Sequence, residues 1–309
     1  MVAFANPQAS LSFLLFITIS APCIPIREIT SRRTRGAISF SVIIEVMNSH
    51  PYWHQQTIDK PLYPDIEWSK PEQQSNRGRL GIIGGNKLGF MSVAASYNTA
   101  LKTGAGEVRV LLPDILRKSI PATMTEVIFG ATNPSGGLSR DALIEMKTIG
   151  DWATGVLLIG DAGRNSETSI LYEDFITDYK GPLTITRDAI DLIKNNDIQL
   201  VDRPNTLLVM SFAQLQKLFQ IVYYPKVLTF SMQLINLVEA IHKFTITYPI
   251  SISVLHKDTL LVASGGEVTS TPWSEPTDIW NGKTATNTAV YWLWANNKIV
   301  ESATTSLLK

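Results

Sequence analysis

Residues 76–112 read NRGRLGIIGGNKLGFMSVAASYNTALKTGAGEVRVLL, and this stretch decides the fold class. The apolar run 80–83 stops at Gly84 and Gly85, as a short buried strand does where it reaches a loop. A helical pattern follows, and then a second apolar run at 108–112. A strand, a helix and a second strand within about thirty residues predict one β-α-β crossover, which joins two parallel strands.

The helix of this unit is expected to begin at Ser92, whose side chain can cap the first turn. Four residues at helical spacing mark its buried face: Val93, Tyr97, Ala100 and Leu101. Gly104 and Gly106 then end the helix and turn the chain into the second strand. The glycines before the helix leave backbone N–H groups unobstructed at a helix N-terminus, which suits a phosphate.

This stretch resembles the opening of the ribokinase-like NAD(P)H-hydrate dehydratases. The resemblance is carried by the loop GGNKLGFMSVA at 84–94 and by the turn ALKTGAGEV at 100–108. In that family a Gly-Ser loop is followed by Gly-Ala, a helix and a Gly-Ala-Gly-x-Val turn. A generic α/β crossover without a ligand would carry similar glycines, so both interpretations remain open on this stretch alone.

The composition is that of a globular protein with a sizeable core, with 45% hydrophobic and 17% charged residues in 309. Basic and acidic residues number 27 each, so the zero formal net charge gives no electrostatic case for nucleic acid or an anionic surface. The single cysteine, Cys23, rules out an internal disulfide and is compatible with a cytoplasmic location. The four histidines show no metal-ligand spacing, so no protein-held metal is expected.

Three segments are predicted along the chain. Residues 1–46 form an N-terminal extension, which is either a targeting segment or sequence upstream of a true start at Met47. Its apolar run, 11–19, is too short to span a bilayer and lacks the preceding positive charge of a secretory signal. Residues 47–75 form an arm rich in proline and aromatic residues that lies on the domain or on a neighbouring subunit. Residues 76–309 form the main domain, for which no membrane partner is expected.

The resemblance continues in order over residues 76–296. The apolar run 155–159 leads into GDAGR, which is similar to the family's I-G-P-G-L-G-R and keeps Gly160 and Gly163, while Asp161 stands in place of proline. The run 183–186 leads into TRDAI, which lines up with the family's D-A-D-A-L and keeps the second aspartate as Asp188.

Strands and helices alternate along this region, with glycine turns between them. This pattern predicts a three-layer α/β/α sandwich around a mainly parallel sheet, in agreement with the ribokinase-like fold that the resemblance implies. Asp188 is a candidate ligand residue, but it could equally be the N-cap of a helix over 189–195.

Four positions that carry polar chemistry in the family are changed in this chain: Thr186 for an aspartate, Gln214 for a glutamate, His256 for a lysine and Ala285 for an aspartate. The last change falls in the family's Gly-x-Gly-Asp motif, where helix amides form an anion hole and the aspartate accepts a proton from the substrate. Alanine cannot accept a proton, and losing a positioned base costs roughly two to four orders of magnitude in rate. Asp278 and Asp188 are the candidates for a displaced base.

The resemblance also implies a nucleotide-binding site, formed by Gly85, Asn86, Gly89, Gly160, Gly163, Gly282, Lys283 and Thr284. The residues GKT at 282–284 do not form a P-loop, because Thr277 stands where that motif requires glycine. Asn281 or Thr284 is expected to cap the helix that follows, and Lys283 could offer a cation to a phosphate there.

The resemblance implies ADP or ATP and Mg²⁺ as cofactors, hydrated NAD(P)H as substrate, and assembly into a homo-oligomer. The favoured hypothesis is a dehydratase-like pseudoenzyme that is catalytically impaired and retains nucleotide binding, because the changes gather on the chemistry while the scaffold glycines persist. One alternative is an active ADP- or ATP-dependent NAD(P)H-hydrate dehydratase that phosphorylates the hydrated nicotinamide and eliminates phosphate. A further alternative is a small-molecule kinase of the same superfold.

Overall fold

The computed structural model describes residues 50–193 and 200–308. All of the described residues belong to one compact unit, Glu45–Lys309. The N-terminal extension predicted at 1–46, and with it the start at Met47, lies outside the described residues, so both stay predictions.

A ten-stranded sheet organises this unit, in the order β1-β10-β9-β8-β7-β6-β5-β2-β3-β4. The strands are β1 Trp53–Gln55, β2 Arg79–Gly84, β3 Glu107–Pro113, β4 Val127–Gly130, β5 Gly155–Gly160, β6 Leu183–Thr186, β7 Thr206–Ser211, β8 Ser251–His256, β9 Thr259–Ser264 and β10 Glu267–Pro272. The run from β4 to β8 is parallel throughout, and only the β8-β9-β10 meander is antiparallel. The prediction of a mainly parallel sheet is confirmed.

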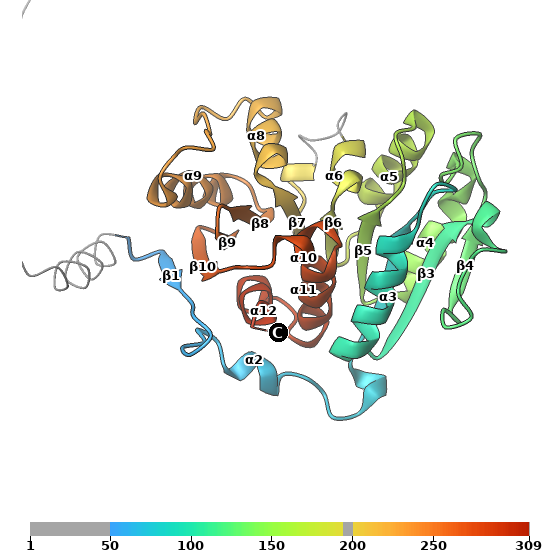
Figure 1. Ribbon diagram of the computed structural model, residues 1–309, viewed down its shortest axis with the longest axis horizontal. Helices are drawn as coiled ribbons and strands as arrows, with labels where there is room; N and C mark the ends of the chain where they lie inside the picture. Colours follow the sequence, from blue (N-terminus) through green and yellow to red (C-terminus); the bar gives the residue numbers. More distant parts are fainter. Residues whose placement is uncertain (1–49, 194–199, 309) are drawn as a thin grey trace, which may run out of the picture. The chain divides into compact units, whose positions relative to one another are not determined.

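Helices cover both faces of the sheet (Figure 1). They are α2 Asp65–Trp68, α3 Met91–Thr103, α4 Leu143–Trp152, α5 Ser166–Asp178, α6 Asp188–Leu192, α8 Phe212–Ile221, α9 Leu234–Thr247, α10 Pro276–Trp280, α11 Lys283–Trp294 and α12 Ile299–Ser306. Alternate residues of β5 point into two separate cores. Val156 and Leu158 belong to the core that also contains residues of α4, α5, α8 and α9, whereas Leu157 and Ile159 belong to the core that contains residues of α3, α11 and α12. This is the expected α/β/α sandwich.

The first β-α-β unit forms as predicted, with two differences in its helix. Helix α3 begins at Met91, so Ser92 lies inside it and does not cap it through its side chain. The amide of Ser92 instead donates to Asp161 Oδ2 at 2.9 Å, a carboxylate from the loop after β5. Leu101, expected on the buried face, is 45% exposed, while Val93 and Ala100 are buried.

Gly106 shows why this unit needs glycine at its turn. Its amide donates to the carbonyl of Gly78 at 3.0 Å. A Cβ at this position would lie 2.5 Å from the carbonyl oxygen of Gln74 and 2.6 Å from that of Gly78, closer than real Cβ atoms approach. Backbone atoms cannot yield to relieve such a contact, so this turn is closed to other residues.

The arm contributes regular structure, which the sequence pattern did not predict. Strand β1 pairs in parallel with β10 and extends the sheet at that edge. Trp53 is buried there, and its indole N–H donates to Ser270 Oγ at 2.9 Å. The part of the arm within the described residues is therefore built into the domain that it was expected to lie on.

Candidate functional site

Seven parallel strands, β2 to β8, end at one edge of the sheet, and five of them end there at Gly84, Gly160, Thr186, Ser211 and His256. The strand order reverses between β2 and β5, because β3 and β4 continue on one side and β6, β7 and β8 on the other. Ligands of open α/β sheets bind outside the carboxyl ends of the strands at such a reversal. This edge is the candidate site.

The glycine loops after β2 and β5 lie against each other at the reversal. The amide of Gly85 donates to the carbonyl of Gly160 at 2.9 Å. Asn86 is buried, and its side-chain amide donates to the carbonyl of Ala162 at 3.4 Å, beside Gly163. The structure thus brings together four residues of the predicted nucleotide site, Gly85, Asn86, Gly160 and Gly163, and the first three of them form hydrogen bonds within the loops.

Gly89, the fifth residue of this group, closes a tight turn with Asn86. The two residues exchange backbone hydrogen bonds of 3.0 and 2.9 Å. A Cβ on Gly89 would meet nothing within 4 Å, so this side of the turn is open. The assignment of these loop residues to a nucleotide site remains a prediction.

Asp188 holds the loop after β5. Its two carboxylate oxygens accept hydrogen bonds from the amides of Asp161, at 2.8 Å, and Ala162, at 3.1 Å. Asp188 is the first residue of α6, and Arg187 is the N-cap, so the predicted N-cap role of Asp188 is wrong. Tyr172 is buried nearby, where burial and these carboxylates raise the pKa of its phenol.

Asp161 and Arg187 form an ion pair across the ends of β5 and β6. One Asp161 oxygen accepts from Arg187 Nη2, and the other accepts from the amide of Ser92. Arg187 Nη1 also donates to the carbonyl of Trp280, the last residue of α10. The pair therefore links the N-terminus of α3 to the segment that leads into α11.

A second ion pair lies beyond the first, toward β7. Asp191 Oδ1 pairs with Lys217 Nζ at 3.2 Å, and its other oxygen accepts from Gln214 Nε2 at 3.0 Å. Gln214 also forms a capping box with Ser211 at the start of α8. Gln214, which stands for the family's glutamate, thus has a structural role at this helix terminus.

A cavity of about 760 Å³ opens over the ends of β6, β7 and β8. Its charged lining residues are Asp161, Arg187, Asp188, Asp191, Lys217 and Lys257. Lys257, in contrast to the other two cations, has no ion-pair partner among the residues described. The apolar rim includes Trp280 and Phe230, whose exposed fractions are 64% and 63%. A volume of this size falls in the range of small-molecule sites.

The N-terminus of α11 lies outside the lining of this cavity. Gly282 is its N-cap in the left-handed conformation, so neither Asn281 nor Thr284 caps it as predicted. A Cβ on Gly282 would lie 2.2 Å from Ile159 Cδ1, which shows how closely the core approaches this glycine. Thr284 and Ala285 are buried, Ala285 with no exposed surface.

The predicted base and the predicted phosphate cation are bonded to each other. Lys283 Nζ donates to Asp278 Oδ2 at 2.7 Å, and both groups are partly exposed. His256 is buried at the end of β8 between Phe212 and Phe230, and burial lowers the pKa of its imidazole. These surroundings make His256 a core residue.

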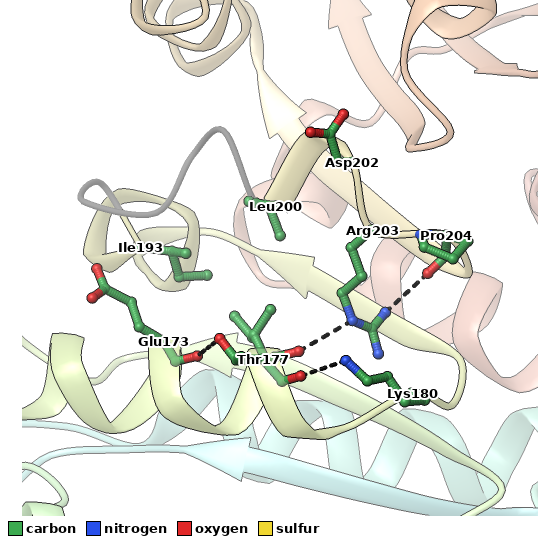
Figure 2. A pocket seen from close by; sticks show the side chains of 9 residues that line it. Glu173, Thr177, Lys180, Ile193, Leu200, Asp202, Arg203 and Pro204 are labelled. Atoms are coloured by element: carbon green, nitrogen blue, oxygen red, sulfur yellow. Dashed lines mark hydrogen bonds between the residues drawn. The ribbon is translucent and has the colours of Figure 1, made fainter.

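A smaller cavity of about 280 Å³ lies at the opposite edge of the sheet, around Arg203 (Figure 2). Arg203 is 8% exposed, and burial lowers its pKa to about 10. Its guanidinium donates to the carbonyls of Ile176, Pro204 and Gly181 at 3.4, 3.2 and 2.9 Å. Because those bonds tie α5 to the starts of β6 and β7, Arg203 serves the fold.

The described part of the chain contains neither a cluster of metal-binding side chains nor a membrane-spanning helix. Nowhere in residues 50–193 and 200–308 do three His, Cys, Asp or Glu side chains gather as a metal site would require. No helix in those ranges is long and apolar enough to cross a bilayer.

Three residues that line the cavity were not predicted as site residues from the sequence: Asp161, Arg187 and Lys257. Each follows directly on a strand and has a positive φ, of 54°, 58° and 56°. Residues other than glycine rarely adopt this conformation, which is found in turns and in strained segments at functional sites. The departure of Asp161 from the family's proline was the one sequence signal for this group.

Comparison with known proteins finds likeness in structure only. No family model and no curated protein sequence matches this chain. A ribokinase-like superfamily protein from Enterococcus faecalis superposes with a TM-score of 0.63 at 15% identity, covering 83% of this chain and 86% of that one.

Two enzymes of named activity give similar superpositions. The ADP/ATP-dependent NAD(P)H-hydrate dehydratase from Bacillus subtilis has a TM-score of 0.52 at 10% identity, covering 78% of this chain and 83% of that one. Hydroxyethylthiazole kinase from Pyrococcus horikoshii has a TM-score of 0.51 at 10% identity, covering 78% and 81%. At these identities the likeness is one of fold, and the fold of this chain is ribokinase-like.

Proposed function

We propose that this chain is a dehydratase-like member of the ribokinase-like superfamily that binds a nucleotide in the cavity over β6, β7 and β8 and has little or no dehydratase activity. The observation that carries the proposal is the environment of Ala285. Ala285 occupies the sequence position of the family's proton-accepting aspartate, it is fully buried, and it does not line the cavity. A methyl group in the core can neither accept a proton nor touch a ligand.

The carboxylates that could replace the lost base at this edge of the sheet already accept hydrogen bonds. Asp188 accepts from two backbone amides, Asp161 from Arg187 and Ser92, and Asp278 from Lys283. These bonds fix the orientation of each carboxylate, so a displaced base could act only on a substrate proton that reaches its remaining acceptor sites. This engagement supports impaired catalysis over the active alternative, in which Asp278 or Asp188 replaces the lost base.

The cavity suits a nucleotide in its size and its lining. The exposed rings of Trp280 and Phe230 offer apolar faces on which a base can stack. Arg187, Lys217 and Lys257 supply positive charge for phosphates. One structural neighbour, the Bacillus subtilis dehydratase, was co-crystallised with ATP and Mg²⁺, which makes ATP or ADP the first ligand to test.

The described residues do not form a cage for Mg²⁺, because the cavity carboxylates are bonded to arginine, lysine and amides. We assign no step to a protein-held metal. A cation that enters with a nucleotide would be held through the phosphates. A homo-oligomeric state and a cytoplasmic location are carried forward as proposals.

The test combines binding with turnover. ATP and ADP are titrated into the full chain by calorimetry, and the same preparation is incubated with hydrated NADH, Mg²⁺ and either nucleotide while nicotinamide absorbance is followed. We expect binding without recovery of absorbance. Turnover that Asp278→Asn abolishes would establish the active alternative, and phosphate transfer to small alcohols would favour a kinase.

A matched pair of tryptophan variants locates the binding site. Trp280→Ala removes the exposed ring at the cavity rim and should weaken ATP binding about tenfold, the scale of one lost base stack. Trp68→Ala removes an 87% exposed ring that does not line the cavity, so it should leave binding unchanged. Equal affinities in the two variants would place the nucleotide elsewhere.

A further inference from the structure

Asp161 and Arg187 are held in backbone conformations that cost energy. Asp161 has φ 54°, and Arg187 has φ 58° and ψ −140°, a region that only glycine adopts without strain. Both residues directly follow neighbouring strands of the sheet, β5 and β6. Their side chains form an ion pair at the cavity wall.

The Arg187 guanidinium has hydrogen-bonding capacity to spare. Nη2 donates to Asp161 and Nη1 to the carbonyl of Trp280. Nε is buried and has no hydrogen-bond partner in the described structure. A guanidinium has five N–H donors in a planar fork that matches two phosphate oxygens. Arg187 therefore has unused donors while it lines a cavity large enough for a ligand.

Asp161 does not depend on Arg187 to stay in place. Its second oxygen accepts from the amide of Ser92 at 2.9 Å, and its own amide donates to Asp188 at 2.8 Å. Ser92 lies in the first turn of α3, where the helix dipole favours a negative charge. The carboxylate thus keeps a partner when the guanidinium turns to a different anion.

From these contacts we propose that Arg187 is the phosphate-binding residue of this cavity and that Asp161 occupies its guanidinium until a phosphate displaces the carboxylate. This inference rests on the proposed function, because it concerns the same cavity. It names the residue that binds the phosphate groups of the ligand. A purely structural ion pair would instead serve only to tie α3 to α10.

The two accounts differ in the sign of two substitutions. Asp161→Asn keeps an oxygen for the Ser92 amide and releases the guanidinium, so pyrophosphate should bind about tenfold more tightly, the scale of one charge-assisted hydrogen bond. Arg187→Gln should weaken pyrophosphate binding by about tenfold or more, and Arg187→Lys should restore part of it. A structural pair predicts lower thermal stability in both variants and no opposite effects on binding.

The second ion pair of the cavity supplies a matched control. Asp191→Asn removes the same charge as Asp161→Asn from the same cavity without touching Arg187. At fixed ionic strength, Asp191→Asn should strengthen pyrophosphate binding less than twofold, the scale of a partly exposed charge pair. If Asp191→Asn strengthened pyrophosphate binding as much as Asp161→Asn does, the effect would come from the net charge of the cavity and not from Arg187, and the proposal would be overturned.

The experiment uses the full chain, with sodium pyrophosphate, ADP and adenosine as separate calorimetric titrants. Adenosine binding should be the same in wild type, Asp161→Asn and Arg187→Gln, because it has no phosphate. If the wild-type chain binds no ATP but the Asp161→Asn variant binds pyrophosphate, the proposed function is refuted and this inference is upheld. The inference is overturned if pyrophosphate binds none of the variants, or if Asp161→Asn and Arg187→Gln shift its affinity in the same direction.

Discussion

Gly160→Ala tests the geometry on which the whole edge of the sheet depends. Gly160 has φ +89°, and a Cβ there would lie 2.1 Å from Asp188 Oδ1 and 3.1 Å from the amide of Ala189. Alanine must therefore displace the Asp188 carboxylate from the amides of Asp161 and Ala162, which it holds at 2.8 and 3.1 Å. The variant tests whether this carboxylate fixes the loop after β5.

Two costs make up the expected loss of stability. A non-glycine residue in the left-handed region costs about 1–2 kcal/mol. Each of the two amides that loses its acceptor adds about 1–2 kcal/mol, toward the lower end of the range for buried donors. We expect Gly160→Ala to lower the free energy of unfolding by about 3–6 kcal/mol, measured as a shift of the urea midpoint at constant m-value.

Gly89→Ala is the matched control, since a Cβ there meets nothing within 4 Å and should change stability by less than about 0.5 kcal/mol. Asp188→Ala then completes a double-mutant cycle with Gly160→Ala. Once the carboxylate is gone the clash disappears, so the double variant should lose less stability than the sum of the single variants. Strict additivity, or equal effects of Gly160→Ala and Gly89→Ala, would refute the reasoning.

Three further predictions concern buried groups. Ala285→Asp should destabilise the chain by about 3 kcal/mol or more in thermal or urea unfolding, because it places a carboxylate where no surface is exposed, and it should not restore turnover; a stable, active variant would show that this position faces an open site. Arg203→Met should cost about 3 kcal/mol in urea unfolding, because it leaves carbonyls at Ile176 and Gly181 without their donor, and a loss below about 1 kcal/mol would contradict that role. Burial lowers the pKa of His256 below its ordinary value of 6.5, so the unfolded chain takes up the proton first and stability should fall as pH drops below about 6.5. His256→Gln should flatten the stability profile over that pH range in urea titrations, and an unchanged slope would count against this assignment.

Local patterns predicted the scaffold well, because glycine turns and apolar runs are set by neighbouring residues. The unit over residues 76–112 and the strands β5 and β6 formed where the pattern placed them. Capping was predicted less well. Helix α3 receives its acceptor from Asp161, 69 residues away, and α11 begins at a left-handed glycine.

The site itself depended on contacts between distant segments. Nothing local to Arg187 shows that it will meet Asp161, and nothing local to β1 shows that it will pair with β10, a strand far away in the sequence. The resemblance drew attention to this edge of the sheet, and the site placed there stays a prediction. It could not show that Asp278 bonds Lys283 or that Ala285 is enclosed in the core, since both follow from packing.

The central claim, nucleotide binding with the proton acceptor lost, is tested most directly by one paired measurement on a single preparation of the full chain. ATP affinity is determined by calorimetry, and dehydration of hydrated NADH with ATP and Mg²⁺ is followed at the same protein concentration. The account predicts saturable ATP binding that Trp280→Ala weakens, with no recovery of nicotinamide absorbance above the protein-free rate. Dehydration at a rate proportional to protein concentration, or no ATP binding at all, would contradict it.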